Sequence, residues 1–204
     1  MSQFNILIDA LPLSVELGGR DFPIAADFRT GILFEQMMQD AELSKQEKLN
    51  TALALYYNHV KIPEHLLPDA CLEITNFYCC GDVETVSNQG AQRRKAMGGR
   101  RTKRIYDFDY DAPYIYAAFL DQYRIDLQDV EFLHWWKFHA LFLGLKEENE
   151  ICKIMSYRAV DLAKIKDRSE RARYADLQAR YKLPDHRTAE EKQAAVGAIF
   201  GGVF

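Results

Sequence analysis

The sequence predicts a mainly α fold: a single helical domain with a small N-terminal β-hairpin and a basic mobile loop. Apolar residues recur at three- and four-residue steps along most of the chain, whereas only residues 13–24 alternate as a strand does. The 204 residues are 48% apolar and 27% charged, with a net charge of −4. This composition is that of one soluble globular domain with a sizeable core.

The hairpin is predicted over residues 13–24. Gly18 and Gly19 lie at its centre and supply the positive φ angles that a two-residue primed turn needs. Pro23 has no N–H group to donate to a neighbouring strand, so it fits an edge strand.

Three helices are predicted between the hairpin and residue 81. Asp27 suits the N-cap of a helix over residues 28–39. Ser44 and Glu47 form a capping box for a helix that ends near residue 57, and Pro68 opens a third helix that ends near residue 78. The apolar positions expected to face inward on the first helix are Phe28, Ile32, Leu33 and Met37.

Residues 82–103 have a different composition. They contain no aromatic residue and three glycines, so they offer little apolar surface to offset the entropy of ordering, and a basic flexible loop is predicted. The basic residues of this loop are Arg93, Arg94, Lys95, Arg100, Arg101 and Lys103, with Arg104 directly after it.

Residues 104–184 predict an aromatic-rich helical half that packs on the same core as residues 1–81. Pro113 opens its first helix, and further helices are expected over residues 129–143, 146–157 and 166–181. Thr188 and Glu191 form a second capping box, which predicts a C-terminal tail helix within residues 185–204.

The predicted helix over residues 129–143 holds both tryptophans and is apolar nearly all the way round. Glu131, His134 and Lys137 alone would face water. Such a helix is either the central helix of a core or a helix with one face held for a partner, and both alternatives stay open. The candidate protein-binding residues on and beside it are Trp135, Trp136, Phe138, Phe142 and Phe132.

No pattern in the sequence predicts catalytic, cofactor-binding or metal-binding residues. Asp107, Asp109 and Asp111 alternate like the first ligands of a calcium loop, but Ala112 and Ala118 stand where that loop needs glycine and glutamate. We interpret the three carboxylates as an acidic approach to a helix N-terminus.

The histidines and cysteines also give no site. His134 and His139 are five residues apart on the predicted helix, so their side chains diverge. Buried, reduced and inert thiols are expected at Cys71, Cys79, Cys80 and Cys152. The sequence therefore predicts that the protein is not an enzyme.

Two further features bear on partners and location. No basic leader with an apolar run is visible at the N-terminus, and no apolar run approaches the roughly 20 residues of a membrane span, so a cytosolic protein without membrane contact is expected. The seven positive charges from Arg93 to Arg104 could neutralise several phosphates, which makes nucleic-acid binding an alternative function. The stretch lacks interleaved aromatics for base stacking, so nucleic acid is the less favoured partner.

Several stretches resemble the bacteriophage gene product fifteen proteins of tailed phages of Gram-positive bacteria. The resemblance covers about the first 184 residues, in order, and includes the hairpin. It rests on DFRTGILFEQMMQD (27–40), RIYDFDYDAPYIYAAFLDQYRIDL (104–127), LHWWKFHALFLGL (133–145), KIMSYRAVDLAKIKD (153–167) and YKLP (181–184).

The resemblance implies a phage- or prophage-encoded morphogenesis protein in the host cytoplasm, similar to the tail assembly chaperones that keep the tape measure protein soluble. It brings no catalytic residue. The major tail protein or a second tail chaperone is a further candidate partner, and a structural tail component retained in the virion is an alternative. Homo-oligomers are expected, through the aromatic helix or the C-terminal stretch AIFGGVF (198–204).

Overall fold

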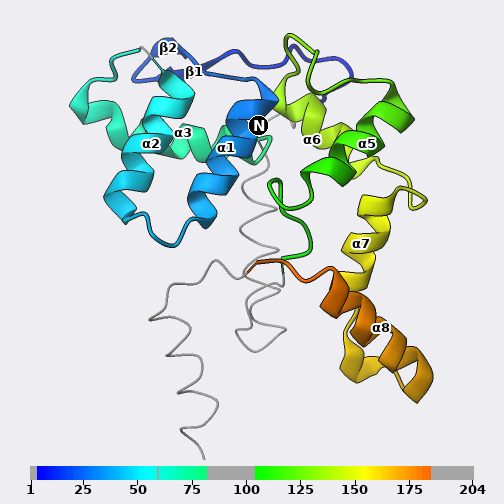
Figure 1. Cartoon of the computed structure of the whole chain (residues 1–204). Helices are drawn as coiled ribbons and strands as arrows, with labels where there is room; N and C mark the ends of the chain where they lie inside the picture. The colour runs from blue at the N-terminus through cyan, green and yellow to red at the C-terminus, as the bar shows by residue number, and fades with distance from the viewer. Residues whose placement is uncertain (1–3, 59, 82–103, 185–204) are drawn as a thin grey trace, which may run out of the picture.

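A computed structural model of the chain describes residues 4–58, 60–81 and 104–184 (Figure 1). This part of the chain is mainly α-helical, as predicted, and its sheet is one two-stranded hairpin. The predicted mobile loop over 82–103 and tail helix over 185–204 lie outside the described residues. The elements in chain order are β1 (Ser14–Leu17), β2 (Arg20–Pro23), α1 (Phe28–Gln39), α2 (Lys45–Tyr57), η1 (Glu64–Leu66), α3 (Leu67–Tyr78), α5 (Ala112–Tyr123), α6 (Trp135–Leu143), α7 (Glu150–Ala159), η2 (Leu162–Lys164) and α8 (Arg168–Arg180).

β1 and β2 form the predicted hairpin. The strands pair antiparallel with Leu17 opposite Arg20, and Gly18 and Gly19 between them have φ angles of 57° and 77°. Positive φ at both positions is what a primed two-residue turn requires. Val15 and Leu17 are buried, so one face of β1 packs against the helices.

The caps predicted for the first helices are present. Asp27 Oδ1 accepts a hydrogen bond from the Arg29 N–H at 3.0 Å. The Ser44 N–H donates to Glu47 Oε2 (2.8 Å) while Ser44 Oγ accepts from the Glu47 N–H (3.3 Å), which completes the capping box of α2. Pro68 lies in the first turn of α3.

The tryptophan helix is shorter than predicted. α6 begins at Trp135 and not at residue 129, because His134 is extended (φ −58°, ψ 137°) and acts as the N-cap. Its Nδ1 accepts from the Trp136 N–H (3.1 Å), so Nε2 carries the proton and donates to the Pro12 carbonyl (2.9 Å). His134 is 2% exposed, and the prediction that it faces water is wrong.

The residues before α6 pair with the residues before α1. The Trp135 N–H donates to the Ala26 carbonyl (2.7 Å), and the Phe28 N–H donates to the Leu133 carbonyl (2.8 Å). Asp27, the N-cap of α1, also accepts from the Leu133 N–H through Oδ2 (3.2 Å). This antiparallel bridge between Asp27 and His134 holds His134 in extended conformation, so the helix does not begin before Trp135.

α6 lies in contact with α1, α3 and α5 at once. Trp135 packs on Gly31 of α1 and stacks on Tyr78 at the end of α3, with ring centroids 5.3 Å apart. Phe138 stacks on Phe119 of α5 at 5.0 Å. Helices from before and after residues 82–103 therefore contribute to one hydrophobic cluster.

Asp111 and Arg158 form a buried ion pair that the sequence did not indicate. Asp111 is 0% exposed and accepts from Nη1 and Nη2 of Arg158 at 2.5 and 2.9 Å. Arg158 also donates to the carbonyls of Ile105 (3.0 Å) and Tyr181 (2.6 Å). Asp111 therefore anchors α7, and with it the end of α8, to the start of α5; its side chain makes no hydrogen bond that caps α5.

We predict that Gly31→Ala destabilises the protein by about 1–3 kcal/mol, because the added Cβ would overlap the Trp135 indole. At a helical position with space, the same change would stabilise by about 0.5–1 kcal/mol. Urea denaturation measures the free energy of unfolding and so gives the sign directly. Combining Gly31→Ala with Trp135→Phe should cost less than the two single changes added together. A stabilised Gly31→Ala variant would contradict the packing.

We predict that Arg158→Leu lowers the free energy of unfolding by about 3–5 kcal/mol, because it leaves the Asp111 carboxylate buried without its partner. Lys153→Leu is the matched control on the same helix. Lys153 pairs with Glu150 at 3.6 Å with both side chains close to half exposed, so its loss should change stability by less than about 1 kcal/mol. Equal losses in the two variants would contradict the assignment.

Candidate functional site

Four of the five predicted protein-binding aromatics lie in the core. Trp135, Trp136, Phe138 and Phe142 are at most 7% exposed, whereas Phe132 is 54% exposed. The sequence left open whether this helix is a core helix or one with a face held for a partner. For these four side chains, the structure shows the core position. Their contribution to partner binding stays a prediction.

The two indole N–H groups are used within the fold. Trp135 Nε1 donates to the Tyr78 carbonyl (2.8 Å) and Trp136 Nε1 donates to the Phe77 carbonyl (2.7 Å). Both carbonyls belong to the last turn of α3, where no i+4 N–H follows within the helix, and the Phe77 carbonyl also accepts from the Cys80 N–H (3.0 Å). The tryptophans therefore cap α3 as well as fill the core.

Among the predicted basic-loop residues, Arg104 alone is described, and it is fixed in place. It pairs with Asp107 Oδ2 (2.9 Å), donates to Gln39 Oε1 at the end of α1, and donates to the Pro184 carbonyl (2.9 Å). Arg104 thus joins both ends of the 104–184 segment to α1. The remaining basic residues, Arg93, Arg94, Lys95, Arg100, Arg101 and Lys103, lie outside the described residues.

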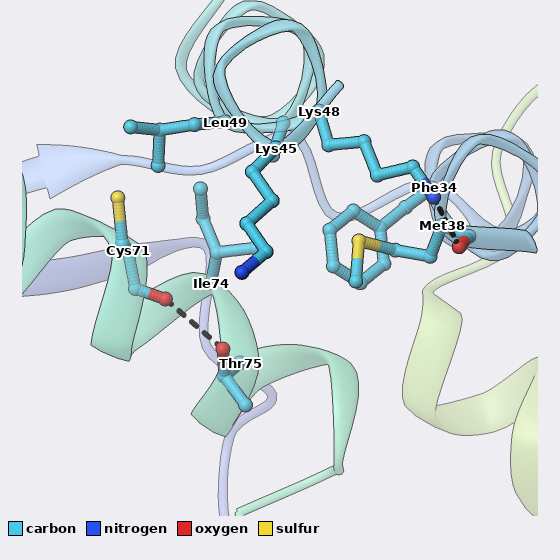
Figure 2. A pocket seen from close by; sticks show the side chains of 9 residues that line it. Phe34, Met38, Lys45, Lys48, Leu49, Cys71, Ile74 and Thr75 are labelled. Atoms are coloured by element: carbon cyan, nitrogen blue, oxygen red, sulfur yellow. Dashed lines mark hydrogen bonds between the residues drawn. The ribbon is translucent and has the colours of Figure 1, made fainter. Parts of the chain in front are cut away.

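An open apolar pocket of about 260 Å³ lies between α1, α2 and α3; we call it the α1–α3 groove (Figure 2). Phe34, Ala52 and Ile74 are buried and form its floor. Met38 and Leu49 stand at its edge and are 50% and 37% exposed. The full lining is Phe34 and Met38 from α1, Lys45, Lys48, Leu49 and Ala52 from α2, and Cys71, Ile74 and Thr75 from α3.

Two lysines give the mouth of the groove a positive charge. Lys48 donates from Nζ to the Met38 carbonyl at 2.8 Å and so spans the gap between α2 and α1. Lys45 is exposed and extends across the opening (Figure 2). The groove thus combines an apolar floor with cations at its edge, a combination that suits an apolar side chain flanked by carboxylates.

The cysteines differ from the prediction in burial. All four are half-buried and not buried as expected. Burial raises the pKa of Cys80 to about 12 and raises the pKa values of Cys71 and Cys152 above their usual range. These thiols stay protonated at neutral pH and are poor nucleophiles, Cys71 in the groove included.

Within residues 4–58, 60–81 and 104–184, no group of three or more His, Cys, Asp or Glu side chains is arranged to hold a metal ion. Over the same ranges, the helices are all too short or too polar to cross a bilayer.

A comparison with protein-family models shows which family the chain belongs to. Residues 7–183 match the family model described as Bacteriophage Gp15 protein. The chain belongs to this phage protein family. The match spans nearly all of the described structure, from the turn before β1 to the end of α8, and confirms the resemblance drawn from the sequence. No curated protein and no solved structure matches the chain significantly.

We predict that stability falls as pH is lowered below about 6.5, partly through His134. Burial lowers the pKa of His134, the neutral ring caps α6, and protonation of Nδ1 would remove the acceptor for the Trp136 N–H. A group whose pKa is lower in the folded state is protonated preferentially in the unfolded state, so the free energy of unfolding decreases as pH falls through the two pKa values. His139, whose pKa burial also lowers, adds to this decrease.

His134→Asn keeps an oxygen acceptor at the N-cap and removes the titration. Urea denaturation between pH 7.5 and 5.0 should therefore show a shallower loss of stability in this variant than in the wild type. His65→Asn, at an exposed position, is the matched control and should keep the wild-type slope. An unchanged slope in His134→Asn would contradict the prediction.

Proposed function

We propose that this Gp15-family protein is a non-enzymatic tail assembly chaperone that binds the phage tape measure protein in the host cytoplasm and keeps it soluble during tail assembly. The observation that carries the proposal is the α1–α3 groove, an apolar site left open on a protein of a phage family. We assign one turn of a client helix to this groove.

The client chemistry fits a groove of this kind. A long helical protein with apolar stripes aggregates when its stripes stay bare, and a chaperone must cover them. In the helix-in-groove mode, the client inserts apolar side chains from one helical face while its backbone remains hydrogen-bonded within the helix. The floor formed by Phe34, Ala52 and Ile74 would take such side chains, and Lys45 and Lys48 would favour acidic residues beside the stripe.

A small groove also fits reversible binding. Burial of two aliphatic side chains contributes on the order of 3–6 kcal/mol before the cost of association is subtracted. Each contact is therefore weak, and stable coverage of a long client requires many copies along it. Weak single contacts let the copies leave one after another as tail tube subunits take their places.

We predict that co-expression with the tape measure protein of the same phage increases the soluble fraction of that client, and that Leu49→Glu removes most of this gain. Glutamate is helix-compatible and would place a carboxylate at the edge of the groove. Leu72→Glu is the matched control, because Leu72 is 56% exposed on α3 and does not line the groove. The readouts are the soluble client on a gel and the co-elution of both proteins in size-exclusion chromatography.

Two outcomes would overturn parts of the proposal. If the client is equally soluble with and without the wild-type protein and no complex elutes, the chaperone function is wrong. If Leu49→Glu and Leu72→Glu both solubilise the client as the wild type does, the function stands and its assignment to the groove is wrong.

A further inference from the structure

Residues 5–9 form a turn that presents aliphatic side chains to solvent. The Asn5 N–H donates to Asp9 Oδ2 (2.6 Å), the Leu7 N–H donates to Asn5 Oδ1 (3.0 Å), and the Ile8 and Asp9 N–H groups both donate to the Asn5 carbonyl (3.0 and 2.8 Å). We call residues 5–9 the N-terminal turn. The backbone N–H groups of Asn5, Leu7, Ile8 and Asp9 are therefore hydrogen-bonded within the turn.

Three consecutive aliphatic side chains of the N-terminal turn are exposed to solvent. Ile6, Leu7 and Ile8 are 41%, 87% and 80% exposed, although they are consecutive. Single exposed aliphatic residues are ordinary, but a contiguous ordered group marks a contact surface. Phe4, next to the turn, packs edge-on against Trp136 with ring centroids 4.6 Å apart, which ties this protrusion to the core.

The N-terminal turn and the α1–α3 groove lie in different parts of the described structure (Figure 1). The segment before β1 runs along the end where α1 begins, and Met38 and Lys45 flank the connection at the other end of the α1–α2 pair (Figure 1). With Phe4 packed on Trp136, the turn does not line the groove of its own molecule.

Shape and charge make the two surfaces complementary. A dry cavity of about 150 Å³ accepts a benzene-sized group, so the groove, at about 260 Å³, has room for the Leu7 and Ile8 side chains. Asp9 follows them directly and is exposed, and the mouth of the groove carries Lys45 and Lys48. An apolar protrusion with a carboxylate beside it thus meets an apolar hollow with cations at its edge.

We propose that the partner of the N-terminal turn is the α1–α3 groove of a second copy of this chain. The contact is head-to-tail: each copy inserts Leu7 and Ile8 into the next copy and offers its own groove to another. Such heterologous contacts produce open chains or rings, not closed two-fold dimers. The inference rests on the proposed function, because it concerns the groove assigned to the client. It adds a regulation of client binding: self-association covers the groove until a client helix displaces the turn.

The size of the contact sets its strength. One turn in one pocket buries far less than the roughly 1,200 Å² of a stable interface. Self-association is therefore expected to be dynamic, with dissociation constants on the order of micromolar or weaker. A weak contact covers the groove in the free protein without competing strongly with a multivalent client.

Sedimentation velocity over a concentration series tests the contact on the full chain. The wild type should show an average mass that rises with concentration, and Leu7→Glu and Leu49→Glu should each raise the apparent dissociation constant at least tenfold. Leu143→Glu and Leu72→Glu, at positions 70% and 56% exposed elsewhere, are the matched controls and should associate as the wild type does. All four positions are solvent-exposed, and circular dichroism melts verify that the variants fold.

Mixing the two deficient variants identifies the head-to-tail arrangement. Leu49→Glu still has an intact turn and Leu7→Glu still has an intact groove, so an equimolar mixture should form heterodimers that grow no further. Restored dimers support the proposal. A monomeric wild type at all concentrations, no complementation in the mixture, or loss of association in Leu49→Glu but not in Leu7→Glu would each overturn it; the last result would mean that another segment occupies the groove.

The two proposals fail separately. If the mixture forms dimers but neither wild type nor variants solubilise the tape measure protein, the self-contact stands and the chaperone function is wrong. If Leu7→Glu solubilises the client fully while the wild type shows no self-association, the chaperone function stands and the self-contact is wrong.

Discussion

The bridge between residues 26–28 and 133–135 is the constraint on which the rest of the structure depends. Two backbone hydrogen bonds and the shared acceptor Asp27 place the N-terminus of α1 beside the N-terminus of α6. Arg29 strengthens the same junction, because its guanidinium donates to the Leu127 and Val130 carbonyls (3.1 and 2.8 Å). With these ends fixed, the Trp135 ring falls on Gly31, and the indoles reach the last carbonyls of α3.

Local signals in the sequence predicted the elements well, and long-range pairing decided what they missed. The Gly18-Gly19 turn, the Ser44–Glu47 box and the cap at Asp27 each involve residues within a few positions of one another, so the sequence displays them directly. The start of α6 depends on residues 106 positions away, and the Asp111–Arg158 pair joins residues 47 apart. Contacts between residues so far apart leave no periodic pattern in the sequence.

The groove was only half visible in the sequence. The capping box and Pro68 predicted the two helices that carry Leu49, Ala52 and Ile74. On α1, Phe28 and Met37 are buried as expected, but Leu33 is 50% exposed and Phe34 is buried. Gly31 explains the difference, since the face without a Cβ is the one that α6 approaches most closely. A glycine within the helical pattern was the available signal for that approach. The aromatic surplus of α6, by contrast, could not reveal that three other helices would surround it.

The bridge also has a consequence for synthesis. The contacts among α1, α2 and α3 are local in sequence, so this half, with its groove, can assemble early as the chain leaves the ribosome. The Phe28 N–H at the start of α1 gains the Leu133 carbonyl, and the last carbonyls of α3 gain the two indole N–H groups, only when residues 133–136 emerge. A nascent chain therefore presents an apolar groove before its own core is closed. The time taken to translate residues 82–132 sets how long that interval lasts.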